Sequence, residues 1–282
     1  MILFADDTTI LASDFNLFNL IDNTNYEFQK INDWFKANEL IVNCEKTNCV
    51  YFSKKQNTLH NLNSMNIIMD GTRLTLSKHV KFLGITLDDQ INFNKHRSEI
   101  CNKISKCIGI SIKLRPVLPE KQLFLLYNSL ILPYLQYCNT TWASTGSTKL
   151  EPILKLQKKA LRICTSSHFL AHSQPLFFRL KTLNVFDIHI YQIALIMFKN
   201  KSAILPPNIS SLFQFNMHVH SYDTRSRPKL HYPKVLNERS LKLIRHQGPR
   251  IWNSLNNNIS TCNSLSLFKY KMKLNLLSGY NH

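Results

Sequence analysis

The sequence predicts an α+β fold, in which short antiparallel strands and one helix precede a mainly helical remainder. Three observations predict it. Short apolar and β-branched runs crowd into the first ~90 residues, as strands require. Apolar residues recur at steps of three and four from Lys95 onward, as helices require. Glycine is scarce, at 6 of 282 residues, which argues against a turn-rich all-β fold. We expect the boundary between Asn92 and Ser98.

The first part is expected to hold hairpins, single strands and one long helix. Residues 2–11 contain two strand-like segments with Asp6 and Asp7 between them, which suits a β-hairpin. Residues 17–40 have the apolar steps of an amphipathic helix. Asp70-Gly71, between two apolar segments, is a strong hairpin signal. Strands are also predicted at 49–52 and 79–87, the second with a break in its alternation at Gly84.

The remainder is expected to be a succession of amphipathic helices joined by polar or proline-containing segments. The predicted helices are one carrying Ile100, Ile104, Ile108 and Leu114, one over 123–131 that is interrupted near Pro133, one over 150–164, one over 188–198 and a last one over 264–277. Residues 208–240 have no clear period and are expected to form an irregular, basic connection.

The formal net charge is +18, from 35 Lys and Arg against 17 Asp and Glu. A surplus of this size points to a polyanionic partner: nucleic acid first, an anionic membrane surface second. The charge is distributed along the chain and is not confined to one tail. We therefore expect a basic groove or broad face.

The seven cysteines signal neither a disulfide framework nor a zinc knuckle, because their number is odd and no C-x-x-C occurs. Buried thiols in a reducing compartment are expected. Asp6 and Asp7 occupy the place where a signal peptide would have its apolar core. No apolar run approaches membrane-spanning length. The expected location is intracellular, in nucleus or cytoplasm, with no membrane partner.

Asp6 and Asp7 form the most informative pair. Adjacent carboxylates repel each other and tolerate burial poorly, so an interaction must stabilise them. A divalent cation such as Mg²⁺ is one answer, since Mg²⁺ binds through one or two carboxylates plus substrate phosphates. The alternative is a solvated Asp-Asp turn without chemistry.

The order of three motifs carries a family resemblance. Phe4-Ala5-Asp6-Asp7 is followed by a helix, then by a polar turn with Lys46-Thr47, then by Lys81-Phe82-Leu83-Gly84-Ile85. This order resembles motifs C, D and E in the back half of the reverse transcriptase palm of non-LTR (LINE-type) retrotransposons. Leu87-Asp88 and His96 look like family features beyond motif E. Three later segments resemble the thumb and C-terminal region of such elements: 133–137, 156–162 and 248–253.

The resemblance implies a domain order and an activity. Residues 1–95 would be a partial reverse transcriptase palm, 96–205 a helical thumb-like domain and 206–282 a basic C-terminal region with a final helix. The activity would be that of an RNA-directed DNA polymerase, a nucleotidyltransferase dependent on Mg²⁺ or Mn²⁺. Its partners would be an RNA template and a DNA primer.

The resemblance also assigns site residues. Asp6 and Asp7 match the motif C acids, so they would be catalytic and would hold the metal. Lys46 would be catalytic near the leaving pyrophosphate; its alternative is a surface lysine at a turn. Phe82, Leu83 and Gly84 would shape the primer grip, where glycine lets a backbone approach a sugar-phosphate closely. An ordinary core strand would explain these last three residues equally well.

One helix has a basic face. Lys155, Lys158, Lys159 and Arg162 recur at steps of three, four and seven, opposite an apolar face of Leu150, Ile153, Leu154 and Leu161. A thumb helix that follows a template–primer duplex would have these properties and would gain salt-sensitive affinity. The alternative is a solvated face on a helix that packs through its other side.

The sequence departs from the family pattern at its start. In the family, the fingers, the motif A aspartate and the motif B loop all precede motif C, which is where this sequence begins. We therefore expect a fragment or truncated copy that is incomplete and inactive alone, with the N-terminal half of the polymerase as a candidate partner. Two alternatives stay open: a non-catalytic basic nucleic-acid-binding remnant, and an inert product whose exposed sheet edge promotes aggregation.

Overall fold

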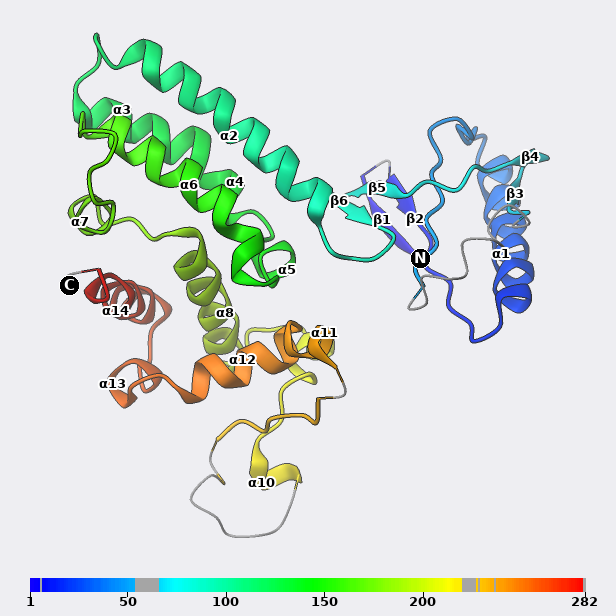
Figure 1. The fold of residues 1–282 in the computed structure, drawn as a ribbon. Helices are drawn as coiled ribbons and strands as arrows, with labels where there is room; N and C mark the ends of the chain where they lie inside the picture. The colour runs from blue at the N-terminus through cyan, green and yellow to red at the C-terminus, as the bar shows by residue number, and fades with distance from the viewer. Residues whose placement is uncertain (6, 54–65, 220–226, 228, 236, 281–282) are drawn as a thin grey trace. The chain divides into compact units, whose positions relative to one another are not determined.

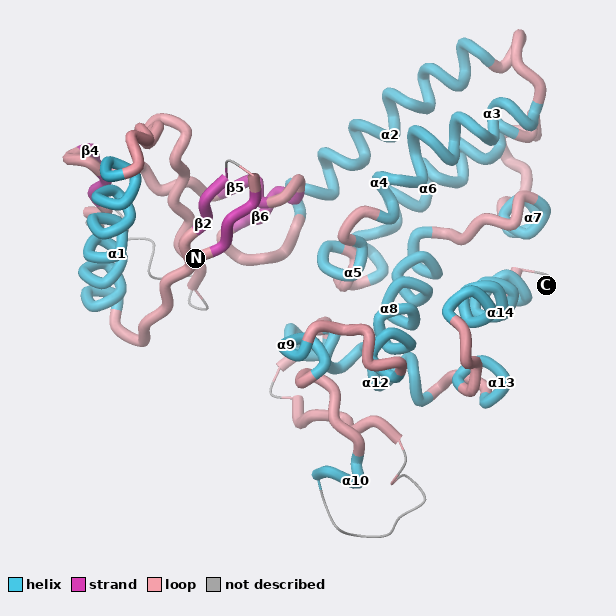
Figure 2. Tube along the Cα trace, turned by 180° about the vertical axis from the view of Figure 1, so that it is seen from behind, coloured by secondary structure: helices cyan, strands magenta, loops and turns pink. Residues whose placement is uncertain are grey.

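The computed structural model describes residues 1–5, 7–53, 66–219, 227, 229–235 and 237–280. Helices dominate it, and the strands form three two-stranded antiparallel pairs (Figures 1 and 2). The expected mixture of helices with a few short antiparallel strands is confirmed. The contacts divide the chain into two units, Met1–Lys95 and His96–His282. The identification of these parts as palm and thumb stays a prediction.

The first unit contains three hairpins in its described residues. Their strands are β1 (Ile2–Phe4) with β2 (Asp7–Thr9), β3 (Ile68–Met69) with β4 (Thr72–Arg73), and β5 (His79–Phe82) with β6 (Ile85–Asp88). Asp70 and Gly71 have φ of 48° and 72°. Two successive left-handed residues make the turn whose twist matches paired strands, so the Asp70-Gly71 hairpin is confirmed.

Two strand predictions in this unit are wrong. Residues 79–87 form two paired strands instead of one, because Leu83 (φ 45°) and Gly84 (φ 79°) are both left-handed and reverse the chain. The break in alternation at Gly84 is a turn. Residues 49–52 form no strand; Cys49 makes only an isolated bridge to Leu76. A strand needs a neighbour along its length, and the described chain supplies one at a single residue.

Helix α1 (Leu17–Ala37) confirms the long amphipathic helix. It begins at Asn16, whose side chain accepts a hydrogen bond from the Phe18 amide at 2.9 Å. Its Phe28 packs with Ile67, Met69 and Leu74 of the β3–β4 hairpin in one small core. The predicted helix extends three residues too far, since the chain leaves the helix at Asn38.

The second unit consists mainly of helices joined by loops in its described residues. Its helices include the five predicted ones, each within a few residues, and others, such as those over 174–179 and 244–253, that were not predicted. They are α2 (Asn94–Leu114, which begins just before the unit boundary), α3 (Glu120–Leu126), the π-helix η2 (Tyr127–Ile131), α4 (Leu132–Gln136), α5 (Asn139–Trp142), α6 (Ser147–Cys164), α7 (Gln174–Arg179), α8 (Val185–Lys201), α12 (Ile244–Asn253) and α14 (Leu265–Ser278). Four more helices, each of four residues like α5, complete the described set: α9 (Pro207–Ser210), α10 (Asn216–Val219), α11 (Glu238–Leu241) and α13 (Asn257–Ser260).

The predicted interruption near Pro133 is a π-helical turn in a continuous path from α3 to α4. Proline has no N–H and its ring crowds the preceding turn, which favours a locally wider helix. Tyr127 and Ile131 of η2 are buried, so the wider turn lies against the core and not in solvent.

Helix α8 is the element around which the later part of the chain packs. Phe198 of α8 stacks on Phe268 of α14 with ring centroids 4.6 Å apart, and Met197 packs with Phe213 and Leu230. Residues beyond 205 therefore share cores with α8. In the described parts of the chain, every helix is too short or too polar to cross a lipid bilayer.

Candidate functional site

The β1–β2 hairpin places the aspartate pair at its turn end. The register pairs Phe4 with Asp7, and Ala5, directly after β1, has a left-handed φ of 52°. Asp7 is exposed, as are the other residues of both strands except Thr9, which is half-buried. Asp6 lies outside the described residues. The predicted hairpin is confirmed, and the metal-binding role of Asp6 and Asp7 stays a prediction.

A short polar turn carries Lys46. Its backbone N–H donates to the carbonyl oxygen of Asn43 at 3.2 Å and to the side-chain oxygen of Asn43 at 3.1 Å. Thr47 closes the same turn through its hydroxyl, which donates to the Asn43 carbonyl at 2.9 Å. The Lys46 side chain is exposed. An ordered turn thus presents a cation to solvent.

The hairpin and the lysine turn are anchored to the same core. Ile10, three residues after Asp7, and Cys44, two residues before Lys46, both pack against the cluster that contains Phe28 and Leu74. A cleft of about 660 Å³ lies beside the lysine turn, lined by residues 41–45, 47–48 and 72–75. The fold therefore holds the motif C and motif D candidates in one small unit.

The predicted primer-grip residues lie at a hairpin tip. Phe82 pairs with Ile85 as the last rung of β5–β6, and Leu83 and Gly84 form the turn. Gly84 is exposed and left-handed, so a side chain there would be strained and would cover the backbone. These residues form a hairpin turn and not part of the single strand that we expected. Phe82 and Leu83 are half-buried, and Gly84 is exposed. Its role as a grip stays a prediction.

Asp88 fixes the chain between this hairpin and α2. Its buried carboxylate accepts the backbone N–H groups of Gln90 at 3.2 Å and Asn92 at 2.9 Å. His96, also buried, packs edge-on against Trp142 with ring centroids 6.0 Å apart. These two residues looked like family features in the sequence. In the structure, Asp88 orders a loop and His96 fills part of a core.

The basic charge belongs to the second unit. Met1–Lys95 has 9 Lys and Arg against 11 Asp and Glu, whereas His96–His282 has 26 against 6. The net charges are therefore −2 and +20. The expectation that the charge is distributed along the whole chain is wrong. A polyanion would be attracted to the helical unit, and the unit with the aspartate pair is close to neutral.

Helix α6 has the two faces that its sequence predicts. Leu150, Ile153, Leu154 and Leu161 are buried, Lys155 and Lys159 are exposed, and Lys158 and Arg162 are half-buried. Arg162 has a partner within the chain, since its Nε donates to the Ala171 carbonyl at 2.8 Å. Lys155 and Lys159 are thus the members of the set that face solvent most fully.

Two of the three later segments that resemble the family have clear structural roles. Gln157 is buried; its Nε2 donates to the Tyr127 hydroxyl at 2.8 Å and the Leu183 carbonyl at 2.9 Å, and its Oε1 accepts from the Val185 amide at 3.0 Å. Asn253 donates to the Leu230 carbonyl at 2.9 Å and accepts the Leu230 amide at 3.1 Å. These segments hold the helical unit together.

No motif in the sequence assigns a role to the loop between α6 and α7. Phe169 and Leu170 at its tip are among the most exposed large apolar side chains of the second unit. The available signal was a short His-Phe-Leu segment directly after a basic helix.

Elsewhere, no three His, Cys, Asp or Glu side chains gather as a metal site would need, within the part of the chain that is described.

Comparison with known proteins gives one distant relative. The chain is 22% identical over 188 residues to a probable RNA-directed DNA polymerase from transposon X-element of Drosophila melanogaster. The match covers 65% of this chain and 20% of that protein, so the chain spans about a fifth of the relative's length. No family model and no solved structure matches. The likeness supports a relationship to transposon-encoded reverse transcriptases.

Proposed function

We propose that this chain is a segment of an RNA-directed DNA polymerase of the non-LTR retrotransposon type. The observation that carries the proposal is the β1–β2 hairpin, which has Phe4 and Asp7 as its closing pair and an acidic connection. The distant likeness to a transposon polymerase also supports it. The substrates would be an RNA template, a DNA primer and deoxynucleoside triphosphates.

In this proposal Asp6 and Asp7 hold Mg²⁺ or Mn²⁺. The exposed carboxylate of Asp7 fits a cation that binds through one or two carboxylates and completes its shell with water and phosphate oxygens. When bound, the cation would act as a Lewis acid on the transferred phosphoryl group. The family supplies a further bridging aspartate from motif A, so the proposal assigns no catalysis to these two carboxylates alone.

Lys46 would stabilise the negative charge that develops on the leaving pyrophosphate. A preorganised cation serves this purpose because it need not reorganise during the reaction. The hydrogen bonds of the Asn43 turn fix the backbone of Lys46 while its side chain stays in solvent. The β5–β6 tip would hold the primer strand, with the exposed backbone of Gly84 against a sugar-phosphate.

The helical unit would bind the template–primer hybrid. Its net charge of +20 favours a polyanion, and Lys155 and Lys159 present two cations one helical turn apart. Because these contacts would be to phosphates, the affinity should fall steeply with salt and depend little on sequence.

A Mn²⁺ titration followed by electron paramagnetic resonance tests the metal assignment. In the presence of an RNA–DNA hybrid, the wild-type chain should retain Mn²⁺, and the double variant Asp6→Asn/Asp7→Asn should lose most of it. Asp14→Asn, at an exposed aspartate in the following loop, is the matched control and should bind as the wild type does. Equal Mn²⁺ binding by the double variant and the wild type would contradict the proposal.

The separation of charge favours a second candidate, a non-catalytic nucleic-acid-binding protein. Of the 35 Lys and Arg, 26 lie in the second unit and the aspartate pair lies in the first, so hybrid binding need not depend on a metal. The Asp6→Asn/Asp7→Asn variant without Mg²⁺ should then bind the hybrid as tightly as the wild type does with Mg²⁺. Polymerisation by the chain joined to an upstream polymerase segment, lost in the same variant, would favour the first candidate.

A further inference from the structure

We propose that the loop between α6 and α7, residues 165–173, is a stacking site for unpaired nucleobases. This inference rests on the proposed function, because it takes nucleic acid as the partner, and deepens it by assigning a base contact. The lysines of α6 would bind phosphates, and the loop beside them would bind the bases of a single strand. Residues 165–173 are called the stacking loop below.

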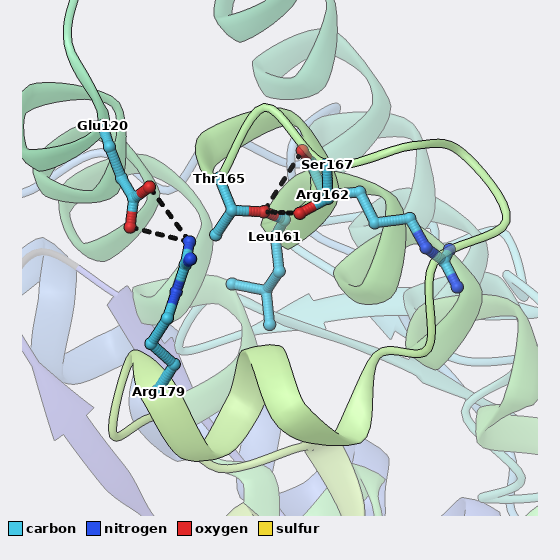
Figure 3. A network of polar contacts seen from close by, with 6 residues as sticks. All are labelled: Glu120, Leu161, Arg162, Thr165, Ser167 and Arg179. Atoms are coloured by element: carbon cyan, nitrogen blue, oxygen red, sulfur yellow. Dashed lines mark hydrogen bonds and ion pairs between the residues drawn. The ribbon is translucent and has the colours of Figure 1, made fainter.

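The stacking loop is held by its own hydrogen bonds. The Arg162 Nε reaches across it to the Ala171 carbonyl at 2.8 Å, and the Ser167 amide donates to the Arg162 carbonyl at 3.0 Å. The Thr165 hydroxyl donates to the Leu161 carbonyl at 2.9 Å and lies 2.7 Å from the Ser167 hydroxyl (Figure 3). A loop ordered in this way loses little conformational entropy when it binds a partner.

The tip of the stacking loop presents apolar surface to water. Phe169 is 72% exposed and Leu170 is 71% exposed. The His168 ring lies 4.6 Å from the Phe169 ring, centroid to centroid, so two flat rings are side by side. Covering neighbouring exposed apolar side chains removes apolar surface from water, which is favourable, so such a patch on an ordered loop favours binding of a partner.

The surroundings of the stacking loop are basic. Arg115, at the end of α2, donates from its Nε to the Ser166 hydroxyl at 3.4 Å. Arg162, in the last turn of α6, donates to the Ala171 carbonyl of the loop, and Lys159 is about one turn earlier on α6. The nearby carboxylate of Glu120 is paired with Arg179 at 2.9 and 3.0 Å (Figure 3), so it does not offset the other cations.

Nucleic acid fits this combination better than the other partners of exposed apolar side chains. Single-stranded nucleic acid is bound by a positively charged path along its backbone and by aromatic side chains on which bases stack. The stacking loop and the last turns of α6 supply both parts. Bases in a paired duplex have their faces covered, so the loop should select unpaired strands.

Binding of a single-stranded oligodeoxyribonucleotide containing 2-aminopurine tests the inference on the whole chain. Phe169→Ala should weaken binding on the order of tenfold and leave the slope of log Kd against log[salt] unchanged, because every phosphate contact remains. Lys155→Gln/Lys159→Gln should lower that slope by about 0.7 for each phosphate of a single strand that is no longer neutralised. Phe169→Trp should retain affinity and the change in 2-aminopurine fluorescence.

Two further variants and one stability measurement serve as controls for the stacking site. Tyr232→Ala removes another exposed aromatic side chain of the same unit and should bind as the wild type does. Arg162→Lys keeps the charge but loses the Nε bond to Ala171, so it should weaken binding with an unchanged salt slope. Because Phe169 is exposed, Phe169→Ala should melt as the wild type does.

The possible failures are distinguishable. If the wild type binds the oligonucleotide and Phe169→Ala binds equally tightly, the stacking inference is overturned and the proposed function stands. If the wild type binds no nucleic acid at any salt concentration, both fail. If Phe169→Ala instead abolishes self-association in sedimentation, or binding to anionic vesicles, the loop is a protein or membrane contact and the inference is overturned.

Discussion

Gly248 of α12 and Met197 of α8 are in such close contact that a Cβ atom on residue 248 would lie 2.5 Å from the Met197 sulfur. The same Cβ would lie 2.9 Å from the Phe213 ring. Glycine inside a helix is unfavourable by itself, so its presence here needs a reason. The reason is the approach of two helices that carry the core of the second unit.

Gly248→Ala should therefore destabilise the chain by about 1–3 kcal/mol, because an added methyl group must displace a sulfur atom and an aromatic ring. Urea unfolding followed by circular dichroism measures the effect. Gly109→Ala is the matched control, since a Cβ at this helical glycine of α2 meets no atom within 4 Å. It should stabilise by roughly 0.5–1 kcal/mol. A destabilising Gly109→Ala with a neutral Gly248→Ala would contradict the packing argument.

Gln157→Leu should destabilise the second unit on the order of 3 kcal/mol. The change preserves side-chain volume approximately but leaves the Val185 amide and the Leu183 carbonyl buried without this partner. Tyr127→Phe removes only the hydroxyl that Gln157 also contacts and should cost about 1 kcal/mol. Thermal unfolding of the two variants gives the comparison; equal effects would show that Gln157 acts mainly through Tyr127.

Asn253→Asp should destabilise at neutral pH by about 1–2 kcal/mol, since a carboxylate would face the Leu230 carbonyl where the amide now donates. Below about pH 4 the protonated acid can donate again, and the penalty should shrink. Asn256→Asp, at an exposed residue before α13, is the control and should be close to neutral. The unfolding free energy of both variants at two pH values measures this; a pH-independent loss at residue 253 would be inconsistent with the pairing.

The buried carboxyl of Asp187 should make the free energy of unfolding depend on pH. Burial raises the pKa of this carboxyl above its ordinary value of 3.8, although the Tyr280 hydroxyl and the Asn184 amide donate to it. A folded-state pKa above the unfolded one favours folding at low pH, and this contribution is lost as pH rises from about 4 through the raised pKa. Asp187→Asn should remove that part of the pH dependence. If plots of unfolding free energy against pH for the variant and the wild type run parallel between about pH 3 and pH 7, Asp187 does not contribute in this way.

Local sequence was sufficient for several elements. Asp70-Gly71 specified its turn, and the Asn16 and Ser264 caps begin α1 and α14 through hydrogen bonds to nearby amides. These features depend on neighbours within four residues. The strand predicted at 49–52 failed because a strand requires a partner from elsewhere in the chain. The division of charge could have been counted from the sequence, since the expected boundary between Asn92 and Ser98 agrees with the one that the contacts define.

The sequence by itself determined the hairpin with Asp7 at its turn end, the order of the helices and the excess of positive charge, since these follow from short-range backbone preferences and composition. Tertiary structure alone decided that Arg162 braces a loop, that Gln157 joins three segments and that Phe169 stays in solvent. The partners that bury a side chain or accept its hydrogen bonds come from other segments of the chain. A local sequence pattern does not specify which segments will pack against it.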